Sequence, residues 1–257
     1  MNIMTYIAMD FWRNLRNFGN SFFIIVLPTA LFLFFGVSTD WNDAMLPNGT
    51  GNVSAYTMVG IAVYGAATAT TSLAGSAAVE LQQGWGRQLA LTSMSHGMFI
   101  AAKSIIALVM AAFPVVLIYL VGLFTITQMT PGRWFSTAML TVLASVPFAL
   151  YGLMIGLAFR SDAAVGAASG ALVIFGFLGN NFFPLEGILL EIGRFTPMYG
   201  MTALARYPLT DGQIVATGDS GMVGSDPLWI LLISITVWSA VFAIGCILLQ
   251  SRRTARR

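Results

Sequence analysis

Residues 228–250 read LWILLISITVWSAVFAIGCILLQ, a run of 23 residues that contains no Asp, Glu, Lys or Arg. As a helix this run rises about 35 Å at 1.5 Å per residue, enough to cross the roughly 30 Å hydrocarbon core of a bilayer. The run is continuously apolar, whereas a strand of a membrane barrel alternates apolar and polar residues. The stretch therefore predicts a transmembrane helix.

Five further runs without a charged residue precede it, at 21–37, 55–79, 104–128, 135–159 and 163–179. Of the 257 residues, 57% are hydrophobic and only 9% are charged, and the mean hydropathy is +0.81. A soluble domain carries about a quarter charged residues, so this chain lacks the surface of one. We expect an all-α integral membrane protein, a single domain over residues 1–257 with six transmembrane helices.

The basic residues are distributed unequally between the two sides that six spans create. Lys and Arg concentrate in cytoplasmic loops of membrane proteins, so their bias predicts the orientation. Nine lie on the side of the termini and three on the other side, and both termini are therefore expected in the cytoplasm, with the chain in the cell membrane. The nine are Arg13, Arg16, Arg87, Lys103, Arg160, Arg252, Arg253, Arg256 and Arg257; the three are Arg133, Arg194 and Arg206.

The residues before the first run carry apolar side chains at helical spacing. This pattern predicts an amphipathic helix in the cytoplasmic membrane interface, with Asp10, Arg13, Asn14 and Asn17 facing away from the apolar side. A plain leader with chance periodicity is the alternative. The apolar positions are Ile3, Ile7, Phe11, Leu15 and Phe18.

Several classes of function are disfavoured by what the chain lacks. A net charge of +2, with four arginines in the last six residues, makes no basic groove for nucleic acid. One cysteine and one histidine give no convincing catalytic residue and no metal site. None of the six runs holds an ionisable residue that would bind a driving proton, although backbone carbonyls at a broken helix can still hold sodium.

The chain also lacks a nucleotide site. A phosphate-binding loop needs Gly-Lys-Ser/Thr, and the only lysine, Lys103, follows Ala102. No cofactor is expected on this chain. If transport is driven by ATP, then ATP and Mg bind to a separate ATPase subunit that docks on this one.

The largest internal loop, residues 80–103, is the expected docking place. Leu81, Trp85 and Leu89 are spaced by four and share one face of a short helix that can act as a rigid lever. Gly84 and Gly86 each weaken that helix by about 1 kcal/mol. A passive connecting loop is the alternative.

Small and hydroxyl-bearing residues form stripes on two of the predicted spans. Small residues allow helices to approach closely and hydroxyls can line a polar path, so these stripes predict a substrate path or a dimer interface. Packing between helices of one subunit is an equal alternative. The predicted residues are Thr57, Tyr64, Thr68 and Thr71 in the second span, and Gly166 and Gly170 in the fifth.

The segment from residue 180 to residue 206 carries prolines and glycines among apolar pieces too short to cross a membrane. We expect a re-entrant hairpin of non-helical backbone that dips into the outer leaflet and closes the exit. Its outer-gate residues are Phe183, Pro184, Glu186 and Pro197. The following residues, 208–227, are expected to form a solvated linker.

Two of these segments resemble a known family. Glu80 followed by Gly84, Arg87, Leu89 and Thr92 is similar to the coupling segment of type-2 ATP-binding cassette (ABC) exporter permeases. Residues 183–186, 195–199 and 203–206 look like the outer segment of that family before its last span. The Gly84-Trp85-Gly86 stretch departs from the charged residues that are common there.

The resemblance implies a two-permease, two-ATPase exporter, with identical or homologous permease chains. It makes Glu80, Gly84, Trp85, Arg87, Leu89 and Thr92 the ATPase-coupling residues. The expected cargo is a hydrophobic or amphipathic compound such as a drug or an antibiotic. Export of a lipid-linked polysaccharide is the nearest alternative, and a channel or secondary carrier that works without ATP is the alternative from another class.

Overall fold

A computed structural model describes residues 3–85, 96–215 and 222–254 of the chain. Helices dominate it, as the sequence predicts, and one short β-hairpin interrupts them. In chain order the elements are α1 (Ile3–Arg16), α2 (Phe18–Ser21), the π-helical turn η1 (Phe22–Val26), α3 (Leu27–Phe32), the π-helical turn η2 (Leu33–Val37), the 3₁₀ turn η3 (Asp40–Asp43), α4 (Val53–Glu80), the π-helical turn η4 (Leu81–Trp85), α6 (His96–Leu123), α7 (Pro131–Ala144), α8 (Val146–Phe159), α9 (Asp162–Leu178), α10 (Gly187–Arg194), α11 (Pro197–Thr210), β1 (Gln213–Val215), β2 (Met222–Ser225) and α12 (Leu228–Thr254).

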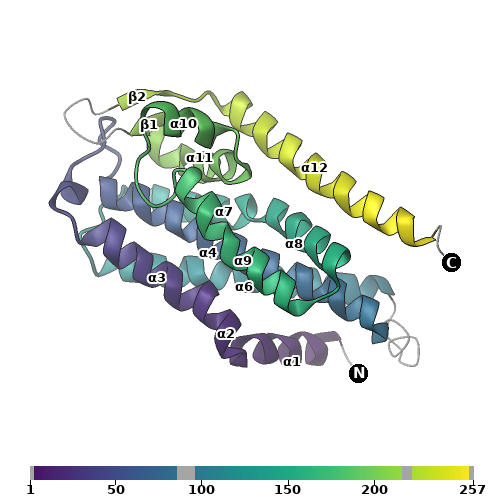
Figure 1. Ribbon diagram of the computed structural model, residues 1–257. Coiled ribbons are helices and arrows are strands. Elements are labelled where there is room, and N and C mark those ends of the chain that lie inside the picture. Colours follow the sequence, from purple (N-terminus) through teal and green to yellow (C-terminus); the bar gives the residue numbers. More distant parts are fainter. Residues whose placement is uncertain (1–2, 86–95, 216–221, 255–257) are drawn as a thin grey trace.

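The long helices run roughly side by side, so that the bundle has two ends (Figure 1). One end, called the α1 end below, holds α1, the last turn of α4, the first turns of α6 and α9, and the last turn of α12. The other, called the α11 end, holds α10, α11, the antiparallel hairpin of β1 and β2, the start of α4 and the last turn of α9. The first and the last described helices therefore reach the same end of the molecule.

Four helical stretches are long and apolar enough to cross a membrane: Val53–Gly84, Ala102–Leu123, Pro131–Phe159 and Leu228–Ser251. Two shorter apolar stretches, Phe22–Val37 and Asp162–Leu178, coincide with the first and fifth predicted spans. The structure thus places a helix at each of the six predicted runs. Whether the two shorter ones cross a bilayer stays a prediction.

Prolines shape the ends and bends of these helices. The predicted span 135–159 is two helices, α7 and α8, that meet at Ser145. Pro147 lies in the first turn of α8 and has no N–H to donate, so the hydrogen bonding of α7 cannot continue through it unbroken. Pro131 and Pro197 begin α7 and α11, where the first N–H of a helix needs no partner within it.

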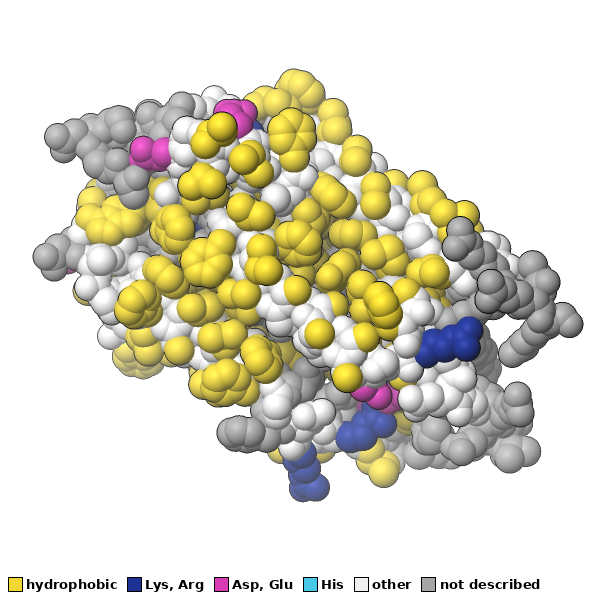
Figure 2. All heavy atoms as spheres, in the orientation of Figure 1, with side chains coloured by type: hydrophobic (Ala, Val, Ile, Leu, Met, Phe, Trp, Pro, Cys, Tyr) yellow, Lys and Arg dark blue, Asp and Glu magenta, His cyan; other side chains and the backbone are white. Residues whose placement is uncertain are grey.

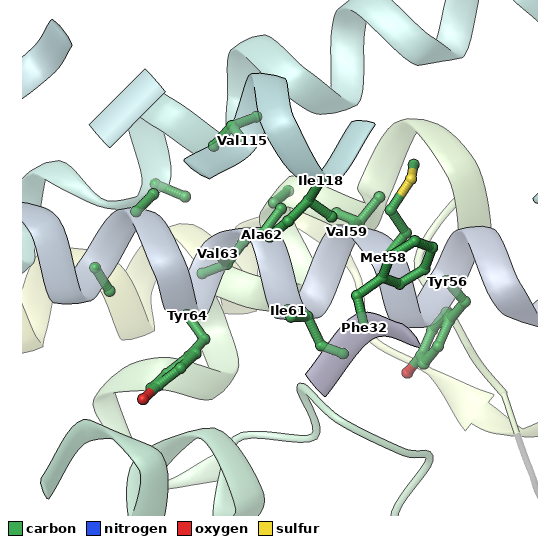
Figure 3. Close-up of a cluster of buried hydrophobic side chains, with 14 of the residues drawn as sticks. Phe32, Tyr56, Met58, Val59, Ile61, Ala62, Val63, Tyr64, Val115 and Ile118 are labelled. Atoms are coloured by element: carbon green, nitrogen blue, oxygen red, sulfur yellow. The ribbon is translucent and has the colours of Figure 1, made fainter. Parts of the chain in front are cut away.

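α4 is the central helix, and the core is built around it. It packs most extensively against α8, α6 and α9. Its side chains from Val53 to Leu73 are buried without exception. Figure 3 shows residues 56–64 of α4 between Val115 and Ile118 of α6 and Phe32 of α3. An apolar helix that is buried on every side is the innermost element of a bundle, which explains why this run shows no amphipathic face.

Glycines bring the backbones of α4 and α8 into direct contact. A Cβ on Gly152 or Gly156 would lie within 3.0 Å of the carbonyl oxygen of Thr71 or Gly75, respectively. Thr71 donates its hydroxyl to the carbonyl oxygen of Phe148 at 3.2 Å, and Gln82 donates its amide to that of Gly156 at 3.0 Å. Such close approach through small residues is typical of helix pairs in membranes.

The outside of the bundle is apolar. Along α12 the exposed side chains include Trp229, Ile233, Val237, Ile244 and Ile247, each more than half exposed. Figure 2 shows apolar side chains gathered across the middle of one face, with basic side chains toward one edge. Soluble monomers rarely expose an apolar surface this continuous, so the belt fits contact with lipid.

Two predictions about the α11 end are wrong. Residues 180–206 are not mainly non-helical, because α10 and α11 occupy most of them and Pro197 starts a helix rather than preventing one. Residues 208–227 are not simply a solvated linker. α11 extends to Thr210, and Ile214 and Val215 of β1 are buried with only 4% of their surface exposed. Whether α10 and α11 re-enter a membrane stays a prediction.

Candidate functional site

A cavity of about 500 Å³ opens at the α1 end, between the α1–α2 corner, α4 and α9. Its wall mixes hydroxyl, amide and ionisable groups with two apolar side chains and two glycines. Such a mixture suits a compound that has both polar and apolar parts. The lining residues are Arg13, Asn14, Asn17, Gly19, Phe23, Ser72, Ser76, Glu80, Asp162, Val165, Gly166 and Ser169.

The small residues predicted on the fifth span face open space. A Cβ on Gly166 or on Gly170 would meet no atom within 4 Å among the described residues. Gly166 lines the cavity, and Gly170 follows it by one helical turn. These two glycines therefore do not pack α9 against its own subunit, which leaves this face available to a substrate or to a second chain.

The stripe predicted on the second span lies elsewhere. Thr57, Tyr64, Thr68 and Thr71 have 1% exposure or less, and they are covered by other helices of the same chain. Thr68 donates to the carbonyl oxygen of Tyr64 at 2.8 Å. Their burial favours the alternative that this stripe packs helices within one subunit. Ser72 and Ser76, which follow Thr68 by one and two helical turns toward the α1 end, line the cavity instead.

Four charged side chains meet beside the cavity and join three helices. Asp10 and Arg13 of α1, Glu80 at the end of α4 and Lys103 near the start of α6 form the cluster, called the ion cluster below. Lys103 Nζ lies 3.0 Å from a carboxylate oxygen of Asp10 and 2.7 Å from one of Glu80. Arg13 pairs with Asp10 at 2.6 Å and also with Glu80. Each cation contacts both carboxylates. Two positive charges balance two negative ones, so the cluster is neutral as a whole.

The ion cluster is more buried than a salt bridge on the protein surface. The side chain of Asp10 is 4% exposed and that of Lys103 is 12% exposed, while Arg13 remains 57% exposed. Partial burial alone would lower the pKa of Arg13, but the Asp10 and Glu80 carboxylates hold it above its ordinary value. Asp10 was expected on the polar, outward side of α1. It instead points into the bundle, because Lys103 offers a buried partner there.

α1 also packs through apolar contacts. Ile7 and Phe11 contact the buried cluster that contains Leu73, Ala102 and Ile106. Met4, Met9 and Trp12 are more than half exposed. The helix therefore has one apolar side on the bundle and further apolar side chains outside it, and its position in a membrane interface stays a prediction.

The predicted coupling segment begins at the ion cluster. Glu80 belongs to the cluster, and η4 continues α4 as far as Trp85. Gly84 has a φ of 95°, a left-handed conformation that favours glycine, so the regular helix ends there. Arg87, Leu89 and Thr92 lie outside the described residues, and the helical face of Leu81, Trp85 and Leu89 stays a prediction beyond this point.

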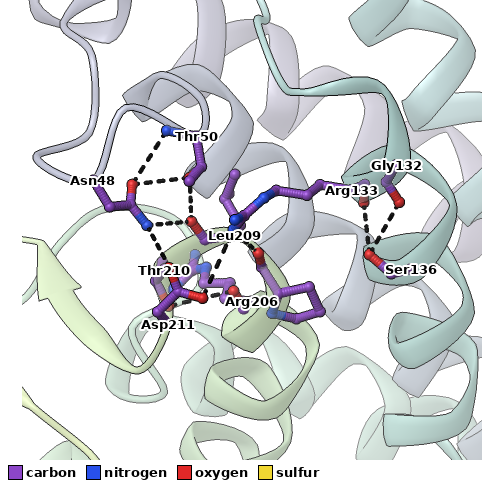
Figure 4. A network of polar contacts seen from close by, with 10 residues as sticks. Asn48, Thr50, Gly132, Arg133, Ser136, Arg206, Leu209, Thr210 and Asp211 are labelled. Atoms are coloured by element: carbon purple, nitrogen blue, oxygen red, sulfur yellow. Dashed lines mark hydrogen bonds and ion pairs between the residues drawn. The ribbon is translucent and has the colours of Figure 1, made fainter.

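Hydrogen bonds to backbone carbonyls hold the α11 end together (Figure 4). Asn48 donates to the carbonyl oxygen of Leu209 at 2.9 Å, and Thr50 donates to the same oxygen. Arg133 at the start of α7 donates to the carbonyl oxygen of Pro208 and lies 3.9 Å from a carboxylate oxygen of Asp211. The last turn of α11 is thus tied to the 48–50 turn and to α7.

The predicted outer-gate residues are found at this end but not in one place. Pro184 and Pro197 are buried, whereas Phe183 and Glu186 are exposed. The ring of Phe183 lies 6.1 Å from that of Phe35 and 6.0 Å from that of Phe177. The sequence did not reveal that aromatic side chains from three separate segments meet here.

A second charged pair joins Arg194 to Asp226, which comes directly after the β-hairpin and has a buried carboxylate. Asp226 is 7% exposed, and it accepts hydrogen bonds from the hydroxyl of Tyr199 at 2.5 Å and from Arg194 at 3.1 Å. Burial, together with the hydrogen bond to Asp226, raises the pKa of Tyr199 well above its ordinary value. These contacts join α10, α11 and the residues before α12.

Sequence reasoning missed the structural role of Arg206 and counted it as an outer-side charge and as part of the family-like segment 203–206. In α11 it is 2% exposed, and its guanidinium donates to the carbonyl oxygens of Tyr56, Asn180 and Asn181. One signal was available. Arg206 is the only charged residue between Arg194 and Asp211, in a stretch where no acidic residue offers it a partner.

Comparison with known proteins shows a distant likeness to a transport permease. No family model matches the chain. A protein of Bacillus subtilis (strain 168) named "Putative transport permease YvfS" is 23% identical over 193 residues, which cover 73% of this chain and 77% of that protein. With the apolar helices, this likeness supports a membrane protein of a transport permease family.

Proposed function

We propose that this chain is the membrane-spanning permease subunit of a type-2 ABC exporter, driven by a separate ATPase subunit. In this proposal all six apolar helices cross the cell membrane, the α1 end faces the cytoplasm, and two permease chains assemble with two ATPase chains. The exported compound is hydrophobic or amphipathic, such as a drug or an antibiotic. The permease itself is not an enzyme.

The ion cluster is the observation that carries the proposal. It clamps α1 to the last residue of α4 and to the start of α6, and these are the two helices that the predicted coupling segment connects. A push on that segment is therefore passed to α1, α4 and α6 together rather than absorbed in a loose loop. The resemblance to the exporter family and the permease relative support the same reading.

The cavity is the proposed entrance of the substrate path. It opens at the end where the ATPase would dock, and its wall offers hydroxyls of Ser72, Ser76 and Ser169 beside the apolar Phe23 and Val165. The open face of Gly166 and Gly170 is the proposed contact with the second permease chain. In that arrangement the cavities of two chains face each other across the interface.

The test is reconstitution into vesicles, with the permease alone and together with a candidate ATPase subunit. We expect uptake of a fluorescent amphiphilic dye into inside-out vesicles only when both proteins and Mg·ATP are present. Arg87→Glu should reduce this uptake while leaving the permease folded, with Arg160→Glu, on another cytoplasmic-side turn, as the matched control. ATP-dependent movement of a lipid-linked sugar instead of the dye would assign the polysaccharide alternative. Rapid uptake by the permease alone, without nucleotide, would refute the proposal.

A further inference from the structure

The cavity at the α1 end has charged groups at its mouth and uncharged ones further in. α9 begins at this end, and Asp162 precedes the cavity-lining Val165 and Ser169 by about one and two helical turns. α4 ends here, and Glu80 follows the cavity-lining Ser76 by about one turn. Both helices therefore place a carboxylate at the mouth and hydroxyl or apolar groups deeper in the bundle.

The carboxylate of Glu80 is already neutralised within the ion cluster. It lies 2.7 Å from the Nζ of Lys103 and also pairs with Arg13. Arg13 is the one cation that lines the cavity among the described residues, and it contacts Asp10 as well, at 2.6 Å. Because the charges of the cluster balance, neither Glu80 nor Arg13 gives the cavity a net charge.

Asp162 differs from Glu80 because no neighbour balances its charge. It is exposed and lines the cavity, and within the described part of the chain no basic side chain lies at ion-pair distance from its carboxylate. Arg160 is exposed nearby in the sequence but does not line the cavity. Ser161 caps α9 by accepting the amide of Ala164, so the Asp162 carboxylate is not needed for that bond. One negative charge therefore remains at the mouth.

An aromatic ring in the same wall adds a second feature. Phe23 of η1 lines the cavity, and 44% of its surface is exposed. The face of an aromatic ring attracts a cation, and the ring also gives apolar groups a surface to pack on. Val165 supplies an apolar side chain from α9. A carboxylate together with an aromatic ring is a combination that recognises a positively charged group joined to an apolar one.

We propose that the cavity binds amphipathic cations, with the positive group of the ligand at Asp162 and its apolar part against Phe23 and Val165. The inference rests on the proposed function and narrows its hydrophobic or amphipathic cargo to one charge class. The volume of about 500 Å³ lies within the range of roughly 300–1,000 Å³ that is usual for small-molecule sites. An anion of the same shape would meet Asp162 as a like charge, which selects against it.

Tetraphenylphosphonium and tetraphenylborate test the charge preference, because these ions carry the same phenyl groups and differ in the sign of their charge. Binding of each radiolabelled ion to the purified permease in a neutral detergent is measured by equilibrium dialysis. We expect the phosphonium ion to bind about tenfold more tightly than the borate ion. Equal binding of the two ions, tighter binding of the borate ion, or binding of neither would overturn the inference.

Asp162→Asn tests the carboxylate. The substitution keeps the shape of the side chain and removes its charge, so phosphonium binding should weaken about fivefold while borate binding does not weaken. Asp162→Glu should retain the preference for the cation. Asp43→Asn is the matched control, because Asp43 is also exposed but does not line the cavity. Unchanged phosphonium binding in Asp162→Asn, or an equal loss in Asp43→Asn, would contradict the assignment.

Phe23→Leu tests the ring, since leucine keeps an apolar side chain without an aromatic face. Phosphonium binding should weaken about threefold. Phe22→Leu, at an exposed neighbour that does not line the cavity, should leave binding unchanged. An equal loss in both variants would remove Phe23 from the site. These measurements need neither nucleotide nor an ATPase subunit. If ATP-dependent dye uptake fails while phosphonium binding is intact, the exporter is refuted and the cation site is not.

Discussion

The α11 end and the α1 end use their buried polar groups differently. At the α11 end, Arg206, Arg133 and Asn181 donate to backbone carbonyls. Gly60 has no side chain, which leaves room for the Arg206 guanidinium and the Asn181 carbonyl oxygen. At the α1 end, charged side chains pair with one another around an open cavity of about 500 Å³.

The α11 end is thus held through backbone atoms, and the α1 end through charged side chains beside a cavity. A bond to a backbone carbonyl fixes the helix that carries it, and removing it exposes the main chain of a buried element. At the α1 end the ion cluster holds α1, α4 and α6 together through side chains, because each cation contacts two carboxylates.

The largest expected effect comes from Gly60→Ala at the α11 end. Its Cβ would lie within 3.0 Å of the Arg206 guanidinium and of the Asn181 carbonyl oxygen. Overpacking and loss of these hydrogen bonds together should destabilise the fold by about 4 kcal/mol. The midpoint of thermal unfolding in detergent is the measurement.

Gly166→Ala at the α1 end is the matched control for Gly60→Ala. A methyl group meets no described atom within 4 Å there, and alanine is the better helix former. Its unfolding midpoint should be unchanged or higher. Equal destabilisation by both substitutions would show that the two ends are packed alike, against the comparison.

A smaller loss of stability is expected from Lys103→Met in the ion cluster. The substitution removes the buried ion-pair partner of Asp10, whose side chain is 4% exposed, and leaves it paired with the largely exposed Arg13. We expect a cost of about 2 kcal/mol. Arg13→Met serves as the control. Arg13 contacts the same two carboxylates but is 57% exposed, so its loss should cost less than about 1 kcal/mol. An Arg13 variant that is less stable than the Lys103 variant would contradict the assigned order of burial.

The smallest effect on stability is expected from Gly170→Leu, and it should fall on transport instead. The side chain enters open space, so the unfolding midpoint should shift by an amount equivalent to less than about 0.5 kcal/mol. If this face contacts the substrate or a second chain, transport or dimer cross-linking should drop about tenfold. Gly132→Leu, which has similar room at the start of α7, is the control. Unchanged cross-linking and transport in the Gly170 variant would remove this face from the proposed interface.

Much of the fold could be predicted because the signals are local. An uninterrupted apolar run needs no knowledge of its neighbours, and a helix lies at each of the six predicted runs. The prediction for residues 180–206 went wrong because Pro184, Gly187, Gly193 and Pro197 were taken as obstacles to helix formation. Instead they lie before, at or near the ends of α10 and α11.

The candidate site was harder to predict because periodicity does not say what covers a face. Thr68 and Gly166 looked equivalent as members of small or polar stripes. Thr68 is fully buried in the centre of the bundle, whereas Gly166 faces a cavity. The partnership of Asp10, Arg13, Glu80 and Lys103 joins residues up to 93 positions apart, which no local pattern can indicate.

The amino-acid sequence by itself determined that the chain forms apolar helices of membrane-spanning length, because hydrophobicity and helix length are properties of single segments. Only the tertiary structure decided which polar groups are buried and which groups they bond to. Arg206 shows why the sequence could not indicate this. Its neighbours in the chain are ordinary, and its role arises from carbonyl groups 25, 26 and 150 residues away, which come together only when α4, α9 and α11 pack.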